Sequence, residues 1–170
     1  MELSICEVLL TKEKFPVTLA IRFLREHQAD FIERPYPYEE HGGTETAARA
    51  LGVDEHLVIK TLVMEDEQKT PFIILMHGDK EVSTKALART IGVKSVHPCT
   101  PEVAMKHTGY MVGGTTPFGT KKPLPVYVEE SILSLPRIFI NAGRRGLLCE
   151  MSPSDLVRVL NPKPVQVALP

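Results

Sequence analysis

A glycine-rich stretch near the middle of the chain, residues 108–122 (TGYMVGGTTPFGTKK), constrains the fold more than any other segment. Gly109, Gly113, Gly114 and Gly119 lie within it, and glycine adopts positive φ, or lets a ligand approach the backbone, without steric cost. Because few of its side chains could fill a core, the stretch predicts a long loop. Adjacent glycines followed by two threonines can direct backbone N–H groups toward one point, as an anion or an oxyanion requires.

Two interpretations of this loop stay open. It is either a site for a polar or phosphorylated ligand, or a long hairpin connection whose glycines only form turns. A nucleotide phosphate loop is excluded, because the lysine of residues 114–121 follows the threonine and Pro123 prevents the helix that must come next.

The length of 170 residues fits one domain, and the net charge of −1 gives no overall field that would draw the chain to nucleic acid or a membrane. Cys6, Cys99 and Cys149 are widely spaced, which argues against a zinc knuckle or disulfide framework and for a reducing compartment. No signal peptide and no membrane span are expected. We therefore expect a cytoplasmic protein without a metal or other cofactor.

Hydrophobic periodicity and helix-capping residues predict an irregular alternation of helices and strands. Helices are expected at residues 16–28, 44–52, 83–91, 101–107 and 152–160, and strands at 31–38, 57–64, 71–76, 94–97, 126–129, 138–140 and 147–151. This order indicates an α/β domain with a mixed sheet rather than a doubly wound nucleotide fold. Residues 16–162 are expected to form the domain, with residues 1–15 as an N-terminal extension and 163–170 as a C-terminal tail.

Lys60 lies in the strongest predicted strand, which is apolar on both faces and therefore central. A lysine is costly to bury there without a partner, so Lys60 is expected to open into a cleft. The alternative is a lysine that extends past the rim of the sheet into solvent.

The glycine-rich stretch with Leu124 and Pro125, the strand VIKTL around Lys60 and the turn NAGRRGL at residues 141–147 together resemble the YbaK family of aminoacyl-tRNA deacylases. That family is related to the editing insertion of bacterial prolyl-tRNA synthetases, and the resemblance covers about residues 18–162 in the same order. It implies a single domain with a curved, mixed, largely antiparallel sheet flanked by helices. It also implies an enzyme that hydrolyses the ester between a wrongly attached amino acid and the tRNA end.

The resemblance assigns roles to individual residues. Lys60 matches an essential lysine that holds the terminal adenosine or its phosphate, and Gly113 and Gly114 match glycines whose amides approach the scissile carbonyl. Tyr36 matches a tyrosine of the pocket. The other expected substrate-binding residues are Thr61, Tyr110, Thr115, Thr116, Pro117, Gly119, Asn141, Ala142, Gly143 and Leu148.

Two of these positions depart from the family pattern, because its cysteine-removing members carry Ser at the place of Asn141 and Asp at the place of Leu148. The resemblance implies mischarged tRNA as substrate, with Cys-tRNA(Pro) leading and alanine or serine esters as alternatives. Prolyl-tRNA synthetase is a candidate partner, and DNA is not. A non-catalytic tRNA- or synthetase-binding module is the competing interpretation.

The sequence offers no convincing nucleophile. Cys149 lies beside two leucines and is expected in the core, while His97 and His107 are expected to be ordinary histidines. The resemblance implies substrate-assisted cleavage, in which the thiol of the amino acid, a ribose hydroxyl or a water attacks.

Two pairs of basic residues lie on glycine turns: Lys121 with Lys122, and Arg144 with Arg145. They are candidate contacts for tRNA phosphates. Solvated turns without a ligand are the alternative.

Overall fold

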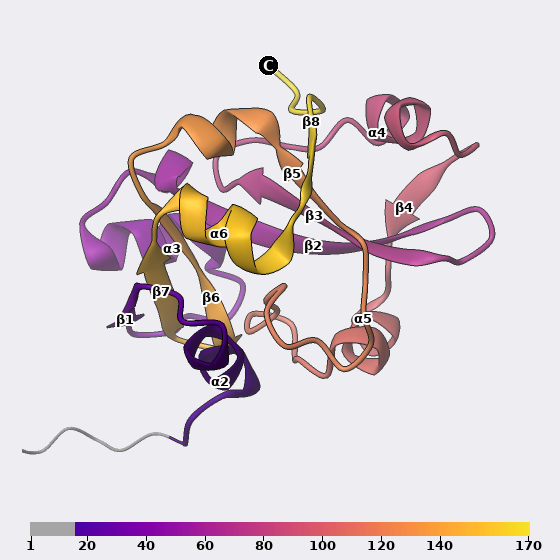
Figure 1. The fold of residues 1–170 in the computed structure, drawn as a ribbon. Helices are drawn as coiled ribbons and strands as arrows, with labels where there is room; N and C mark the ends of the chain where they lie inside the picture. Colours follow the sequence, from indigo (N-terminus) through magenta and orange to yellow (C-terminus); the bar gives the residue numbers. More distant parts are fainter. Residues whose placement is uncertain (1–15) are drawn as a thin grey trace, which may run out of the picture.

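A mixed sheet of eight strands lies at the centre of the computed structural model, which describes residues 16–170 (Figure 1). In chain order the strands are β1 (Phe31–Pro35), β2 (Val58–Asp66), β3 (Pro71–His77), β4 (Val96–Pro98), β5 (Val126–Glu129), β6 (Ile138–Arg144), β7 (Leu147–Met151) and β8 (Lys163–Val165). Their spatial order is β1-β7-β6-β2-β3-β5-β8, with β4 paired to the end of β2. The β2–β6, β3–β5 and β5–β8 pairs are parallel and the others antiparallel. The expected α/β class with a mixed, largely antiparallel sheet is confirmed.

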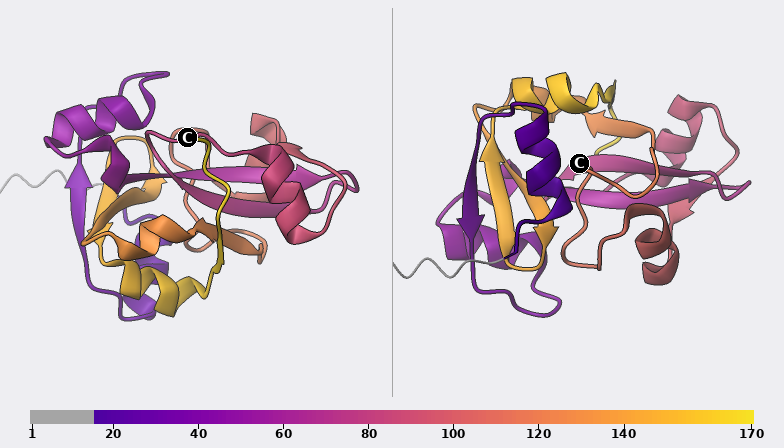
Figure 2. Two further views of the ribbon diagram at one scale, coloured as in Figure 1. Left: turned by 90° about the horizontal axis from the view of Figure 1, so that it is seen from above. Right: turned by 60° about the horizontal axis from the view of Figure 1, so that its bottom comes forward.

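Helices cover both faces of this sheet. The α-helices are α2 (Leu19–Glu26), α3 (Gly43–Leu51), α4 (Thr84–Ile91), α5 (Pro101–Thr108) and α6 (Pro153–Leu160). Helices α2 and α6 lie on one face and α3 lies on the opposite face (Figure 2). The largest core cluster joins Ile21 and Leu24 of α2 and Leu156 of α6 to strand residues such as Ile59 and Ile140. Burying such a side chain contributes about 1.5–3 kcal/mol, so these apolar faces hold the layers together.

Most helix ends follow signals that the sequence displays. At the start of α4, the Ser83 hydroxyl accepts from the backbone N–H of Ala86, and Gly92 ends the helix in the left-handed conformation. Both were predicted. At the start of α6, the Ser152 hydroxyl accepts from the N–H of Asp155.

Two helix starts differ from the expectation. The first helix was expected from Pro16 to about residue 28, but it spans Leu19–Glu26 because the Thr18 hydroxyl accepts from the N–H of Ile21 and caps it. The next helix was expected from residue 44, with the Thr44 side chain as its N-terminal cap. Thr44 lies inside α3 instead, where its hydroxyl donates to the Glu55 carboxylate at 2.7 Å.

Strand β2 is central, as its apolar faces predict. Its antiparallel register with β3 sets Ile59 opposite His77 and Lys60 opposite Met76. Paired residues share a face and successive residues alternate, so Lys60 and His77 project from opposite faces. Strand β1 is an edge strand, as its prolines predict, but it ends at Pro35 rather than at residue 38.

The last residues are part of the sheet rather than the expected tail. Strand β8 pairs in parallel with β5 and forms an edge, where Pro164 is tolerated because one side needs no donor. The Glu129 carboxylate then accepts from the N–H groups of Val167 and Ala168 at 2.8 and 3.1 Å. Val167 is buried. A carboxylate distant in the sequence therefore orders a segment whose prolines locally indicate a loop.

The hairpin between β6 and β7 is tighter than expected. Residues 141–146 were expected to form a turn, but β6 continues to Arg144 through a β-bulge and only Arg145 and Gly146 remain as the turn. The expected N-terminal extension, residues 1–15, lies outside the described residues. Among the helices of residues 16–170, none has the length and apolarity that a bilayer crossing needs.

Candidate active site

A pocket of about 750 Å³ lies where two parallel strands part. Strands β2 and β6 pair only at Val58 with Phe139 and at Ile59 with Ile140, although both strands continue. Residues 58–64 of β2 line the pocket from this split onward. The split begins directly after the first two residues of β2, and both strands continue beyond it without pairing to each other.

Lys60 lines the pocket, which agrees with the expectation that its side chain extends into a cleft. By the strand registers it shares a face with Asn141 of β6 and Leu148 of β7, which also line the pocket. Its ammonium Nζ lies 3.2 Å from the Glu81 carboxylate, and the two side chains are 19% and 80% exposed. An ion pair with one such exposed partner contributes at most about 1 kcal/mol, so a substrate group can compete for the ammonium.

The glycine loop reaches the pocket through a tight turn. The N–H of Gly114 donates to the carbonyl of Met111 at 2.8 Å, and Gly113 has a φ of +88°, as a type II turn requires at its third residue. A Cβ on Gly113 would lie 2.7 Å from the Tyr38 hydroxyl. Both conditions select glycine at this position.

Asn141 fixes this turn against the sheet. Its side-chain amide donates to the carbonyl of Gly113 at 2.9 Å, and its side-chain oxygen accepts from the N–H of Gly143 at 2.7 Å. The turn at Gly113 is therefore held beside the pocket, while Tyr110 and Phe118 of the same loop pack in the largest core cluster.

Gly113 and Gly114 do not play equal parts. Gly113 and Thr115 line the pocket, and within residues 16–170 their N–H groups have no hydrogen-bond partner. Gly114 is buried, its N–H is used in the turn, and it does not line the pocket. The Gly114 N–H is therefore directed to the carbonyl of Met111, and its expected approach to the substrate stays a prediction.

Eight residues expected at the site line the pocket, namely Tyr36, Lys60, Thr61, Gly113, Thr115, Asn141, Arg145 and Leu148. The Thr61 hydroxyl oxygen is buried and has no partner among the described residues. Leaving a buried polar atom unpaired costs about 1–3 kcal/mol, and by strand alternation this hydroxyl projects from the face opposite Lys60. Burial raises the pKa of Tyr36, so its phenol stays protonated at neutral pH.

Six expected residues do not line the pocket: Tyr110, Thr116, Pro117, Gly119, Ala142 and Gly143. The Tyr110 hydroxyl donates to the carbonyl of Phe118 at 2.6 Å, and burial raises its pKa to about 12. The carbonyl of Ala142 accepts from the Thr18 hydroxyl at 2.5 Å. These residues shape the site without lining it.

Of the four basic residues on the glycine turns, one lines the pocket and three do not. Arg145 lines the pocket, where its Nε donates to the carbonyl of Val112 at 2.9 Å and its guanidinium lies 5.2 Å from the centre of the Tyr38 ring. Lys121, Lys122 and Arg144 do not line it. The Lys122 ammonium lies 3.3 Å from His107.

Sequence reasoning missed Tyr38 and Glu81, which both line the pocket. Tyr38 lies three residues beyond the end of β1, directly after Pro37. Its side chain contacts Gly113 and Arg145. Glu81 follows β3, and the register of Lys60 with Met76 places the residues after β3 near Lys60. A carboxylate shortly beyond the partner strand was the available signal.

Neither described cysteine is a thiolate at neutral pH. Cys149 is fully buried in the core, as predicted, and burial raises its pKa to about 12. Cys99 lines the pocket, but burial and the nearby Glu65 carboxylate raise its pKa to about 11. Because the thiolate is the nucleophilic form, neither residue provides an attacking group.

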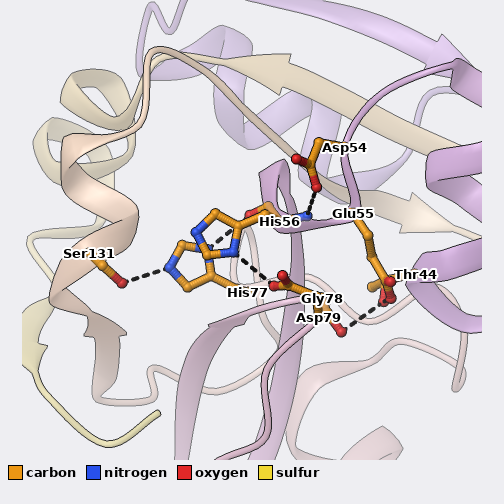
Figure 3. Close-up of polar contacts among 8 residues, drawn as sticks. All are labelled: Thr44, Asp54, Glu55, His56, His77, Gly78, Asp79 and Ser131. Carbon is orange, nitrogen blue, oxygen red and sulfur yellow. Dashed lines mark hydrogen bonds and ion pairs between the residues drawn. The ribbon is translucent and has the colours of Figure 1, made fainter. Parts of the chain in front are cut away.

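A histidine cluster lies outside the pocket, at the end of β3 (Figure 3). His56, His77 and Asp79 offer three potential metal-ligating atoms within 4.8 Å of one another. The two imidazole rings are stacked, with centroids 3.7 Å apart and planes inclined by 6°. Imidazole nitrogens bind metal in the ring plane at about 2.0–2.1 Å. One ion cannot meet that condition for both stacked rings, so this arrangement does not fit a metal.

Known proteins resemble this chain in sequence and in fold. The family model described as "Aminoacyl-tRNA editing domain" matches residues 39–159. The "Putative Cys-tRNA(Pro)/Cys-tRNA(Cys) deacylase EbsC" of Enterococcus faecalis is 30% identical over 145 residues, which cover 85% of this chain and 88% of that protein.

A proline–tRNA ligase of Thermodesulfovibrio yellowstonii is 38% identical over 71 residues, which cover 42% of this chain and 12% of the ligase. A crystal structure described as "a putative trans-editing enzyme for prolyl tRNA synthetase" superposes with a TM-score of 0.78 at 22% identity. The superposition covers 89% of this chain and 96% of that one, which shows a shared fold.

Proposed function

The chain belongs to the aminoacyl-tRNA editing domain family, and from this premise we propose that it removes cysteine from Cys-tRNA(Pro) by substrate-assisted ester cleavage. As a member of this family it is an aminoacyl-tRNA deacylase. The proposal concerns the amino acid, the tRNA and the route of cleavage. The observation that carries it is that Lys60 lines the same pocket as Gly113 and Thr115, whose N–H groups have no hydrogen-bond partner among the described residues.

The pocket suits the end of a charged tRNA. Its volume of about 750 Å³ is in the range of small-molecule sites, about 300–1,000 Å³, and leaves room for an aminoacyl group with its adenosine. Tyr38 and Arg145 give it an aromatic and a cationic wall. Both surfaces suit a base and its phosphates.

Gly113, Thr115 and Lys60 supply stabilisation of the transition state. Hydrolysis of an ester passes through a tetrahedral oxyanion, which preorganised N–H donors and a nearby cation stabilise. Loss of one such donor typically costs about 100- to 1,000-fold in rate. Lys60 also holds the carbonyl oxygen or the adjacent phosphate and so orients the ester.

The attacking group comes from the substrate or from water. Cys99 and Cys149 stay protonated at neutral pH, so neither supplies a thiolate. A thiol or ribose hydroxyl held beside the carbonyl has a high effective concentration, and such orientation contributes about 7–11 kcal/mol. The cysteine of the substrate therefore suits this pocket, because it brings its own nucleophile.

The side-chain wall favours an uncharged amino acid side chain. Leu148 is buried and apolar, and both ends of the Asn141 amide are bonded to backbone groups. Neither residue offers a charge to the substrate. Cysteine, alanine and serine all fit such a wall, and cysteine is placed first because the EbsC relative is named for Cys-tRNA.

The test is hydrolysis of tRNAPro charged separately with cysteine, alanine and serine. We expect Cys-tRNAPro to be cleaved fastest, and cysteine on another tRNA to show whether the protein reads the tRNA body. Preferred cleavage of Ala- or Ser-tRNAPro would replace cysteine by that amino acid. Failure to cleave any of them by a folded protein that still binds tRNA would instead support a non-catalytic module. Adding prolyl-tRNA synthetase to the assay tests whether that enzyme is a partner. We expect the deacylation to take place in the cytoplasm, where tRNA is charged.

Basic residues near the pocket are proposed to hold the tRNA backbone. Neutralising Lys121, Lys122, Arg144 and Arg145 together should flatten the dependence of tRNA affinity on salt, because each phosphate contact contributes to that slope. An unchanged slope would mean that these turns are only solvated.

A further inference from the structure

Glu81 is the acidic group that faces the proposed catalytic lysine. Its carboxylate lies 3.2 Å from the Lys60 ammonium, so the pocket presents a positive and a negative charge side by side. The other carboxylates of the pocket wall lie near different partners: Glu39 is 3.8 Å from Arg49, and Glu40 is 4.0 Å from His41.

The backbone of Glu81 is held by hydrogen bonds, while its side chain is largely exposed. The Glu81 carbonyl accepts from the N–H of Leu169 at 2.8 Å, and the next residue, Val82, forms a bridge with Ala168. On the other side, Asp79 pairs with His56 at 2.8 Å. The side chain itself is 80% exposed, so leaving Lys60 costs little burial energy.

An aminoacyl ester carries the matching pair of groups. Its α-ammonium and its carbonyl oxygen are attached to adjacent carbons and lie about 3 Å apart by covalent geometry. When Lys60 faces the carbonyl oxygen, the neighbouring ammonium comes next to the position of the Glu81 carboxylate. The ion pair of the free protein is then exchanged for two charge-assisted contacts with the substrate.

We propose that Glu81 recognises the free α-ammonium group, so that the pocket accepts esters of amino acids with a free amino group and rejects N-acylated ones. This inference rests on the proposed function and defines its substrate class. Acylation removes the positive charge, adds bulk, and leaves the Glu81 carboxylate without a substrate partner. A free aminoacyl-tRNA would thereby be separated from formylated and peptidyl forms.

The experiment measures binding rather than turnover. The ligands are 3′-alanylamido-adenosine, in which an amide replaces the ester, and its N-acetyl derivative. Calorimetric titration of the wild-type protein should give about 10- to 100-fold tighter binding of the free amine, the range for a charge-assisted hydrogen bond. In Glu81→Gln this preference should fall to about threefold or less. The matched control Glu45→Gln, an exposed glutamate on α3 outside the pocket, should keep the full preference.

Three results would overturn the inference. They are equal binding of the two ligands by the wild type, no measurable binding of either, and an equal loss for both in Glu81→Gln. The last result would mean that Glu81 only positions Lys60. Because this binding does not require turnover, a protein that cleaves no aminoacyl-tRNA yet prefers the free amine would contradict the proposed function and still support the role of Glu81.

Discussion

The pocket and the histidine cluster contain residues from adjacent pairs of the β2–β3 hairpin, Lys60 with Met76 and Ile59 with His77. The two regions differ in how completely their polar groups are hydrogen-bonded. Lys60 projects from one face and His77 from the other. In the pocket, the Thr61 hydroxyl oxygen has no partner among the described residues, and Lys60 meets only a well-exposed carboxylate. In the cluster, both nitrogens of His77 are bonded.

The bonding of His77 defines its state. Its Nδ1–H donates to the carbonyl of His56 at 2.8 Å, so its Nε2 is the acceptor for the Ser131 hydroxyl at 2.7 Å (Figure 3). Burial lowers the pKa of His77, which keeps the ring neutral. A complete set of bonds indicates a structural role, whereas incomplete bonding at the pocket indicates a place for a ligand.

Replacing Lys60 should have the largest effect on activity. Lys60→Ala removes the cation at the ester, and we expect kcat/KM for deacylation to fall by about 100- to 1,000-fold. Thermal unfolding should change little, because the pair with Glu81 adds little stability. Lys85→Ala, an exposed lysine of α4, is the control. Near-wild-type turnover in Lys60→Ala would remove the lysine from the mechanism.

The glycine turn gives a second test of the pocket. Gly113→Ala places a Cβ 2.7 Å from the Tyr38 hydroxyl at a φ of +88°, so the turn must shift. We expect about a tenfold or greater loss of kcat/KM, because small displacements at an active site are costly. Gly92→Ala is matched in backbone strain, with a φ of +79° and open space around the Cβ. Equal activity of Gly113→Ala and Gly92→Ala would mean that the geometry of the glycine turn does not matter for catalysis.

The histidine cluster should respond in stability rather than in activity. His77→Leu leaves the part-buried carbonyl of His56 without its donor, and we expect the free energy of unfolding to fall by about 1–3 kcal/mol. Urea denaturation measures this change. Ser131→Ala should cost less, because Ser131 is exposed and water can replace it. If His77→Leu lost activity while keeping its stability, the contrast between the two regions would fail.

The smallest expected effect is on the pH dependence of stability. The pKa of His77 is lowered from 6.5 mainly by burial, with the hydrogen bond to His56 opposing the shift. Below about pH 6.5 the unfolded state therefore binds a proton that the folded state refuses, and stability falls as the pH decreases. Asp79 affects stability at lower pH. Burial raises the pKa of its carboxyl group, but the hydrogen bond with His56 outweighs burial and lowers this pKa from 3.8. The stability that this contact contributes is therefore lost as the pH falls through the lowered pKa.

His77→Gln should remove part of the loss of stability between about pH 7 and pH 5. Urea unfolding at both values measures the difference between the variant and the wild type. An unchanged pH dependence in the variant would mean that His77 is not the group responsible.

The sequence predicted the features that depend on neighbouring residues. The caps at Ser83 and Gly92 and the central strand β2 follow from local sequence patterns. The glycine loop was also predicted, but the expectation that few of its side chains fill the core is wrong, because Tyr110 and Phe118 are buried there. The resemblance added the grouping of Lys60 with Asn141, which are far apart in the chain and adjacent in the fold.

Features that depend on distant partners were not predictable. Strand β8 forms because β5 and the Glu129 carboxylate supply its hydrogen bonds, although its own residues include proline. Gly114 and Gly113 are equivalent in sequence, and only the turn from Met111 decides which N–H stays unbonded. Glu81 enters the pocket through the register of β2 with β3, which no local pattern specifies.

The most direct measurement is a crystal structure of the protein with 3′-alanylamido-adenosine. If the split between β2 and β6 is the site of ester cleavage, the acyl carbonyl oxygen will lie about 3 Å from the N–H of Gly113 or Thr115, with the Lys60 ammonium beside it. An acyl group bound outside this pocket, or turned away from both Lys60 and the glycine loop, would contradict it.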